Sequence, residues 1–270
     1  MTKKSNRAVG ILGGGNLGGA LARGWTRSDL LKPADIHVTR RHEDKLQDLR
    51  DAGFRTGADN LQAVAASDCV LVAVQPGQLD GVLTEIAPAL DPARHSVISV
   101  VTGVSIAQLR EKLGNEIPVV RAMPNTAVET LSSMTCLAVD RDDSPGLEPA
   151  RKLFDAVGRT MVIDEEMMIP ATALCACGIA FFLRTIRAAA QGGTEIGFHA
   201  DEALTLAAQT ARGAAELALR GGNHPEGEID RVTTPRGCTI AGLNELEHRG
   251  FSSAMIRGIL TSSRRADELT

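Results

Sequence analysis

Short apolar runs alternate with helix-like segments along the first part of the chain. The apolar runs predict strands over residues 8–12, 35–39, 69–74, 96–101, 118–122, 134–139 and 160–163. Between them, the spacing of apolar residues predicts helices over residues 17–28, 43–52 and 81–90. This alternation predicts a parallel sheet, and the continuously apolar run at 69–74 is typical of a strand covered on both faces. We therefore expect an α/β domain with a mainly parallel sheet over residues 1–164.

After residue 164 the pattern becomes purely helical. Helices are predicted over residues 167–191, 200–220, 240–249 and 252–268, and no strand signal occurs. The first of these helices carries apolar or small residues on nearly every face, so we expect it to be buried. A domain of about 100 residues has little room to bury such a helix by itself. Residues 165–270 are therefore expected to form an all-α domain that makes an oligomer interface.

The same apolar segment raises the question of a membrane span. Residues 167–183 carry no charge and are followed by Arg184 and Arg187. This length is near the lower limit for a span, and Pro170 and Thr172 interrupt the apolar run. We expect a buried helix and no membrane association.

Composition narrows the classes of protein. Apolar residues make up 43% and charged residues 23%, as in soluble globular proteins, and the net charge of −4 gives no electrostatic reason for a nucleic-acid partner. Five irregularly spaced cysteines and the polar residues 1–7 favour a reduced, cytoplasmic protein without a secretory signal. The chain has no tyrosine, and no lysine follows Lys152, which excludes mechanisms that need a Tyr–Lys pair or a lysine in the second half.

A glycine-rich turn follows the first predicted strand. It reads Gly13-Gly14-Gly15-Asn16-Leu17-Gly18 and opens a helix, which is the context that a dinucleotide-binding fingerprint requires. Gly13 permits the tight turn, Gly15 lets the backbone approach the pyrophosphate, and Gly18 lets the helix pack closely on the strand. The helix amides and dipole favour the phosphate anion. The turn predicts a dinucleotide site that includes Asn16 and Leu17; a glycine-rich turn without a ligand is the alternative.

The end of the second predicted strand indicates which dinucleotide binds. A site that prefers NAD places Asp or Glu there, whereas this chain has Thr39-Arg40-Arg41. Each guanidinium could form charge-assisted hydrogen bonds to a 2′-phosphate that contribute roughly 1.5–3 kcal/mol. We expect NADPH, with NADH as a possible second cofactor. The alternative is that these residues form the solvated basic start of the next helix.

Other predicted strands end in residues suited to the cofactor. Val74, Gln75 and Pro76 are expected on the adenosine side, while Ser99, Thr102 and Gly103 are placed more loosely near the nicotinamide half. Asn125, at a further strand end, is expected to bind the ribose or the carboxamide; the alternative is a turn residue after Pro124.

Three further segments carry a family resemblance. They are Met123-Pro124-Asn125-Thr126, Ala207-Ala208-Gln209-Thr210, and Val232-Thr-Thr-Pro-Arg-Gly-Cys-Thr-Ile-Ala-Gly-Leu243. With the glycine turn, in this order and spacing, they make the chain resemble the pyrroline-5-carboxylate reductase family over almost its whole length. The resemblance implies reduction of 1-pyrroline-5-carboxylate to L-proline, the last step of proline biosynthesis, by hydride transfer from NADPH. It also implies a Rossmann-like domain and a helical domain that interlocks two subunits, commonly as part of higher oligomers.

The segment from Thr234 to Thr239 is the candidate substrate site. Thr234-Pro235 has the character of a helix N-cap followed by the first helical position, and Gly237 lets the backbone approach a small anion. In the family, the residue that matches Thr239 lies close to both substrate and nicotinamide, and its hydroxyl is able to donate to the ring nitrogen. We assign Thr239 as catalytic, and Thr234, Arg236, Gly237 and Cys238 as substrate-binding; the alternative is that both threonines are only caps.

The chain departs from the family pattern near these regions. Cys175-Ala-Cys-Gly-Ile-Ala180 replaces the usual Ser-Gly-Ser-Gly-Pro-Ala, and Arg187 replaces an acidic residue. Arg236-Gly237 replaces Gly-Gly, and Cys238 replaces Thr, so Arg236 is a candidate second contact to the carboxylate and the ring size of the imine is open. Cys175 and Cys177 point about 200° apart on a helix and have no histidine cluster near them, so we expect small buried residues and no metal site.

Two alternative functions stay open at this point. One is another two-domain NADP-dependent imine or hydroxyacid dehydrogenase, although hydroxyacid enzymes typically use a lysine that the helical domain lacks here. The other is a non-catalytic regulator that senses NADPH, which has no need of the Thr239 segment.

Overall fold

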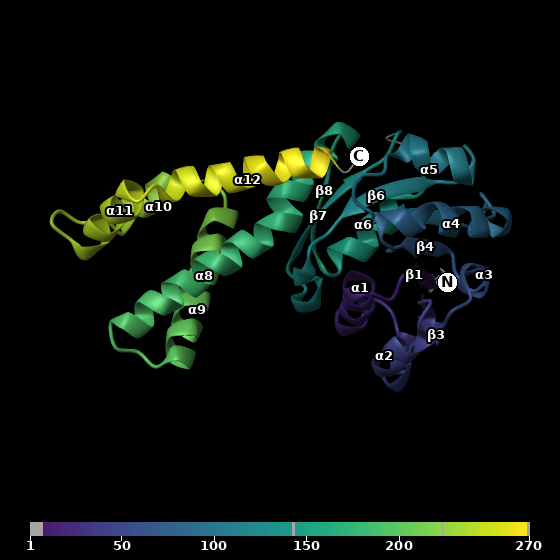
Figure 1. The fold of residues 1–270 in the computed structure, drawn as a ribbon, viewed down its shortest axis with the longest axis horizontal. Helices are drawn as coiled ribbons and strands as arrows, with labels where there is room; N and C mark the ends of the chain where they lie inside the picture. The colour runs from purple at the N-terminus through teal and green to yellow at the C-terminus, as the bar shows by residue number, and fades with distance from the viewer. Residues whose placement is uncertain (1–7, 142–143, 223, 269–270) are drawn as a thin grey trace. The chain divides into compact units, whose positions relative to one another are not determined.

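The computed structural model describes residues 8–141, 144–222 and 224–268 (Figure 1). The described residues form two compact units. One contains the described residues up to Cys177 together with those from Ser262 onward, and the other is Gly178–Thr261. All strands belong to the first unit, and no strand occurs among the described residues after residue 164, as the helical pattern predicted.

An eight-stranded sheet organises the first unit, in the order β3-β2-β1-β4-β5-β6-β7-β8. The strands are β1 Val9–Leu12, β2 Ile36–Thr39, β3 Arg55–Gly57, β4 Cys69–Val72, β5 Ser96–Ser99, β6 Val119–Met123, β7 Ser133–Ala138 and β8 Gly158–Val162. The seven predicted strands are confirmed. The sequence did not predict β3, because this three-residue edge strand contains no apolar run and is partly exposed.

The one departure from parallel pairing lies between β6 and β7, which run antiparallel with Met123 opposite Cys136. The connection between these strands spans only residues 124–132 and contains the short 3₁₀ helix Thr126–Thr130. A parallel crossover needs a dozen or more residues, so this connection reverses the chain instead. β8 pairs parallel to β7 after the crossover through α6.

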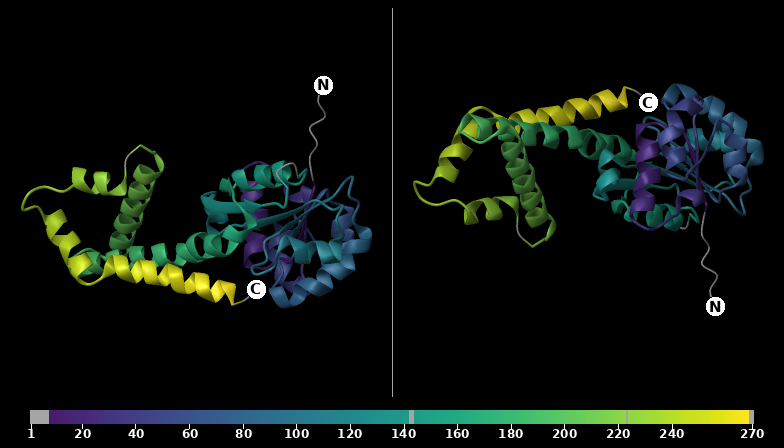
Figure 2. Two further views of the ribbon diagram at one scale, coloured as in Figure 1. Left: turned by 90° about the horizontal axis from the view of Figure 1, so that it is seen from above. Right: turned by 90° about the horizontal axis from the view of Figure 1, so that it is seen from below.

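Helices cover both faces of the sheet (Figures 1 and 2). They are α1 Asn16–Arg27, α2 Gln47–Asp51, α3 Asn60–Ala65, α4 Pro76–Ile86, α5 Ile106–Leu113, α6 Leu147–Asp155 and α7 Met168–Ala171, followed by a π-helix over Thr172–Cys177. Neighbouring residues of one strand enter different cores: Leu71 packs in the cluster of Trp25, and Val72 in that of Leu83. This explains why the strands are apolar without alternation.

The second unit is a set of helices. Its elements are α8 Gly178–Glu195, α9 Ala200–Leu219, α10 Pro225–Arg231, α11 Cys238–His248 and most of α12 Phe251–Asp267. α8 and α9 pack side by side, with Gly193 directly against Ala203 (Figure 1). The helix Glu165–Glu195 is long and apolar enough to cross a membrane by length and composition.

A single chain leaves this apolar helix partly uncovered, and its burial with the help of other chains stays a prediction. Phe182 is 58% exposed and Leu183 is 59% exposed. The physical reason is that a helix packed on one neighbour buries one stripe of its surface, while α8 is apolar on most of its circumference.

Candidate cofactor site and substrate segment

The glycine turn lies where β1 ends, between the ends of β2 and β4. The amides of Gly13 and Gly14 both donate to the carbonyl of Thr39, at 3.1 and 2.7 Å. Gly13 has a φ of +113°, and a Cβ there would lie 2.4 Å from the carbonyl oxygen of Ala73. Only glycine fits both conditions. The turn is thereby fixed at the carboxyl edge of the sheet, where open parallel sheets bind ligands.

Two other glycines of the turn differ in what surrounds them. A Cβ at Gly18 would lie 2.3 Å from the carbonyl oxygen of Gly13, so this residue is needed for helix packing. A Cβ at Gly15 would meet nothing within 4 Å. Gly15 precedes α1 without a side-chain cap, and Asn16 is exposed, so the first amides of the helix face open space. This arrangement suits a phosphate.

The basic residues after β2 divide into two kinds. Arg40 is half-buried, and its guanidinium Nη1 donates to the carbonyl of Gly14 at 3.1 Å, so it lies against the glycine turn. Arg41 is exposed. The side chain of Thr39 is buried and donates to Asn60 Oδ1 at 2.6 Å, so Thr39 supports the turn through its carbonyl rather than its hydroxyl.

Asn60 is a residue that the sequence reading missed. It begins α3, and its Nδ2 donates to Glu85 Oε2 at 2.8 Å. It stands at the same edge as the turn because Thr39 bonds to it. The sequence signal for this helix is Asp59, because aspartate is a favoured N-cap residue and Asn60 follows it directly. The side chain of Asp59 accepts a hydrogen bond from Gln62 N at 3.0 Å.

The segment after β4 opens a second helix. Val74 is half-buried, Gln75 precedes α4 without a side-chain cap and is exposed, and Pro76 is the first helical residue. A Cβ at Gly77 would meet nothing within 4 Å. The start of α4 is therefore as open as the start of α1, and both follow strands that are neighbours in the sheet.

Asn125 is tied into the protein itself. Its Oδ1 accepts from the amide of Ala127 at 3.0 Å, and its Nδ2 donates to the carbonyl of Cys175 at 3.2 Å. These contacts match the turn-residue alternative, and they connect the end of β6 to the π-helix. Ser99 is likewise buried, and its hydroxyl accepts from Val101 N at 3.3 Å.

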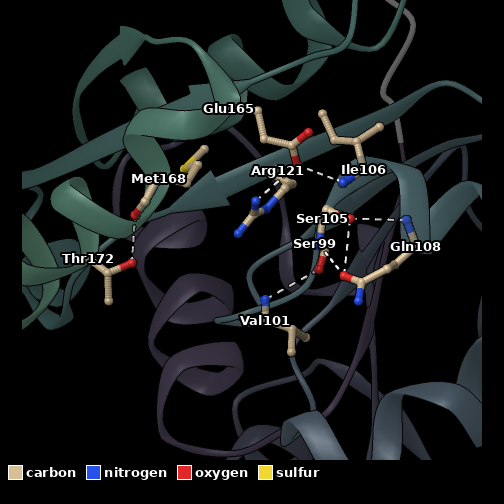
Figure 3. A network of polar contacts seen from close by, with 9 residues as sticks. All are labelled: Ser99, Val101, Ser105, Ile106, Gln108, Arg121, Glu165, Met168 and Thr172. Carbon is tan, nitrogen blue, oxygen red and sulfur yellow. Dashed lines mark hydrogen bonds and ion pairs between the residues drawn. The ribbon is translucent and has the colours of Figure 1, made fainter. Parts of the chain in front are cut away.

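A polar network lies beside the end of β5 (Figure 3). Buried Arg121 of β6 forms an ion pair with Glu165 at 2.9 Å. Glu165 Oε1 also accepts from the amide of Ile106 at 2.6 Å, at the start of α5. A cavity of about 1070 Å³ opens here, lined by Gly103, Ser105, Gln108, Arg121, Val139, Asp140, Val162, Ile163, Asp164, Glu165, Glu166 and Ile169. No local pattern indicates the pairing of Arg121 with Glu165, because the two residues are 44 positions apart.

The predicted substrate segment belongs to the second unit. The amide of Gly237 donates to the carbonyl of Thr234 at 2.9 Å, closing a tight turn. Gly237 precedes α11, which begins at Cys238 and contains Thr239 as its second residue. The expectation that Thr234-Pro235 starts a helix is therefore wrong: Pro235 occupies the second position of a turn, a position that suits its fixed φ.

Arg236 is the third residue of that turn and has a φ of +61°. Glycine is the residue that tolerates this conformation best, and an arginine there is strained by about 1–2 kcal/mol. Thr234, Arg236 and Cys238 are exposed, and Thr239 is half-buried. Gly237 provides no side-chain cap, so the first amides of α11 are available to an anion.

Within the described ranges 8–141, 144–222 and 224–268, no three His, Cys, Asp or Glu side chains form a group that could hold a metal ion.

Comparisons with known proteins bear on the whole chain. Residues 165–269 match the family described as pyrroline-5-carboxylate reductase dimerisation, and residues 8–103 match NADP oxidoreductase coenzyme F420-dependent. Pyrroline-5-carboxylate reductase 1 of Dictyostelium discoideum is 50% identical over 99% of this chain, which spans half the length of that relative. Pyrroline-5-carboxylate reductase 2 of the same organism is 45% identical, over 98% of this chain and 94% of the relative.

A solved structure confirms the fold. Plasmodium falciparum pyrroline carboxylate reductase with NADP bound is 23% identical and superposes with a TM-score of 0.88, over 98% of each chain. The Rossmann-like sheet followed by helices is thus the fold of that enzyme as well. By sequence identity over nearly its whole length, the chain belongs to the pyrroline-5-carboxylate reductase family.

Proposed function

We propose that this protein reduces 1-pyrroline-5-carboxylate to L-proline by hydride transfer from NADPH, the last step of proline biosynthesis. The observation that carries the proposal is the open glycine turn at the carboxyl edge of the sheet, in a chain of this family. Bound NADPH supplies the hydride, so the residues of the chain need only hold the cofactor, anchor a carboxylate and polarise a C=N bond.

The decisive experiment mixes the protein with NADPH and pyrroline-5-carboxylate and follows the loss of nicotinamide absorbance, with proline measured as product. Loss of NADPH with a six-membered cyclic imino acid in place of pyrroline-5-carboxylate would favour a different ring. Binding of NADPH without turnover of either imine would favour the regulator. Turnover of a hydroxyacid with NADP would favour the dehydrogenase.

The cofactor preference rests on Arg40 and Arg41. Arg40 holds the carbonyl of Gly14, whereas Arg41 is exposed beside it, so Arg41 is free to face a 2′-phosphate without supporting the turn. Replacing Arg41 with Ala should lower kcat/KM for NADPH by roughly 10–100-fold and leave that for NADH unchanged. Arg40→Ala is the matched control, and it should weaken both cofactors because it also disturbs the turn. Equal loss with both cofactors in Arg41→Ala would contradict the preference.

The substrate site is proposed at the start of α11. The amides after Gly237 suit the carboxylate, and Thr239 suits donation from its hydroxyl to the ring nitrogen. Thr239→Val keeps the shape and removes the donor, so kcat should fall by roughly 100-fold while the unfolding temperature is unchanged. Unchanged turnover in Thr239→Val would exclude a catalytic role for Thr239.

Arg236 keeps a strained backbone where glycine would relax it. Strained backbone positions cluster at functional sites, so the strain at Arg236 supports a functional role. The proposed role is a second contact to the substrate carboxylate. Arg236→Gly should raise KM for the imine and leave KM for NADPH unchanged. An unchanged KM for the imine would remove this contact from the proposal.

The two parts of the chain are proposed to have different roles. Residues 1–164 are proposed to bind the cofactor, and residues 165–270 to bind the substrate and form a dimer or a dimer-based higher oligomer. The match of residues 165–269 to a dimerisation family and the exposed apolar side chains of α8 support this assignment. A second copy, rather than lipid, is then the cover for α8, in a cytoplasmic protein without a nucleic-acid partner. Full recovery in the supernatant without detergent, as a species larger than one chain, tests this part.

A further inference from the structure

Two cysteines from distant parts of the chain meet beside Asn125. Cys136 is in β7 and is 4% exposed. Cys175 is in the π-helix and is half-buried. Cys136 belongs to an apolar cluster with Met123 and Met168, Cys175 packs against this cluster, and the two thiols lie within hydrogen-bonding reach of each other. Cys177, two residues further along, is not part of this cluster.

The two thiols are chemically unequal. The hydrogen bond from Cys136 lowers the pKa of the Cys175 thiol to about 7, although burial acts in the opposite direction. The same hydrogen bond, together with burial, holds the pKa of Cys136 well above its usual range. Cys175 is therefore a substantial thiolate near neutral pH, and the thiolate is the nucleophilic form of cysteine. Cys136 stays protonated and close to it.

We propose that Cys136 and Cys175 are a peroxide-sensitive dithiol that closes into an intrachain disulfide. The proposed reduction of the imine uses neither thiol, so the dithiol is a second reactive site in addition to that function. Its oxidant is a hydroperoxide, and its reductant is a small thiol or a dithiol protein.

The oxidation proceeds in two balanced steps. The Cys175 thiolate attacks one oxygen of the hydroperoxide, so that an S–O bond forms, the O–O bond breaks, and the other oxygen leaves as hydroxide or alkoxide and takes a proton from water. Cys175 is then a sulfenic acid, oxidised by two electrons. The Cys136 sulfur next attacks the Cys175 sulfur: the S–S bond forms, the S–O bond breaks, and the hydroxyl leaves as water with the proton of Cys136.

The disulfide would connect β7, the strand beside the β8 edge of the sheet, to the π-helix. The carbonyl of Cys175 already accepts from Asn125, so the covalent link falls on a segment held at the end of β6. A π-helix bonds its backbone less regularly than an α-helix and often marks a functional position. Oxidation would therefore add a covalent link to a segment that Asn125 of the β6 end contacts through one hydrogen bond in the reduced protein.

The test uses the full-length reduced protein. It is exposed to hydrogen peroxide, remaining thiols are alkylated, and the digested peptides are identified by mass spectrometry. We expect a peptide pair joined through Cys136 and Cys175, formed roughly ten-fold faster than any oxidation of the exposed Cys238. A thiol reductant should separate the pair.

Three variants sharpen the result. In Cys136→Ser, Cys175 should accumulate as a sulfenic acid trapped by dimedone; in Cys175→Ser, no linked pair should form. Cys177→Ser is the matched control on the same helix and should keep the link. A link from Cys175 to Cys177, or a Cys175 that stays a thiol while Cys238 oxidises, would overturn the proposal. The wild-type peptide map alone distinguishes these outcomes, so a variant that folds poorly does not affect the conclusion.

Discussion

The two compact units bury their apolar residues to very different extents. In the first unit the largest side chains, Trp25 and Phe154, are completely buried, and their rings meet edge to face at 6.3 Å. In the second unit Phe182, Leu183 and Ile196 are 58%, 59% and 78% exposed. A sheet with helices on both faces closes its own core, whereas packed helices that are apolar on several sides do not.

The two units therefore contribute differently to stability and to assembly. The proposed cofactor turn lies in the unit that closes its own core, and the proposed substrate segment lies in the unit that leaves apolar surface uncovered. Exposed apolar surface of this extent marks an interaction site. We therefore expect changes in the first unit to act on folding and cofactor binding, and changes in the second to act on self-association.

The largest expected effect is on assembly. Phe182→Asp places a charge on the apolar surface of α8, and burying it in a dimer without a partner costs several kcal/mol. Self-association should weaken by about 100-fold or more, as measured by sedimentation velocity over a range of concentrations. Leu61→Asp is the matched control, because Leu61 is 43% exposed in the first unit. Equal mass for Phe182→Asp and wild type would contradict the comparison.

A change in the closed core should act on folding instead. Trp25→Ala removes a fully buried side chain whose Nε1 donates to the carbonyl of Leu153 at 2.8 Å. The free energy of unfolding should fall by about 3–5 kcal/mol, measured by circular dichroism in urea. Leu183→Ala should cost the isolated chain under about 0.5 kcal/mol, because the side chain is mostly exposed. A similar loss in both variants would remove the contrast between the units.

Within the first unit, two glycines of one turn should respond differently. Gly18→Ala brings a Cβ against the carbonyl oxygen of Gly13, so it should lower the free energy of unfolding by about 1–3 kcal/mol. Gly15→Ala meets nothing within 4 Å, so folding should be unchanged while the Kd for NADPH rises about ten-fold or more. Calorimetric titration and urea unfolding separate the two effects. Normal NADPH affinity in Gly15→Ala would place the phosphate elsewhere.

The smallest expected effect is a pH dependence of the first unit. Burial, with a smaller contribution from Arg55 and against the influence of Asp59, lowers the pKa of His37 below its ordinary value of 6.5. The unfolded chain therefore takes up this proton at a higher pH than the folded chain does. The stabilisation is complete above about pH 6.5 and is lost as pH falls towards the lowered pKa. His37→Gln should show a shallower decline of the unfolding temperature between neutral and mildly acidic pH. Parallel declines would contradict this.

The parts that could be predicted from sequence are those with local causes. The glycine turn required a strand, a positive φ at Gly13 and a close approach at Gly18, and each leaves a signal in neighbouring residues. The continuous apolar strands were visible because both of their faces are covered. The helices α3, α5, α6 and α10 were not predicted, and Asn60 was missed together with α3.

The alternation of strands and helices, the glycine turn after the first strand and the family could all be inferred from the sequence. Which distant side chains meet depends on the tertiary structure. The reversal between β6 and β7 sets Cys136 opposite Met123, and the π-helix then packs Cys175 against the same cluster. The fold likewise brings Glu165 to Arg121 and ties Asn125 to the carbonyl of Cys175. Local patterns record the backbone that each segment prefers, whereas such contacts depend on how the segments are arranged in space.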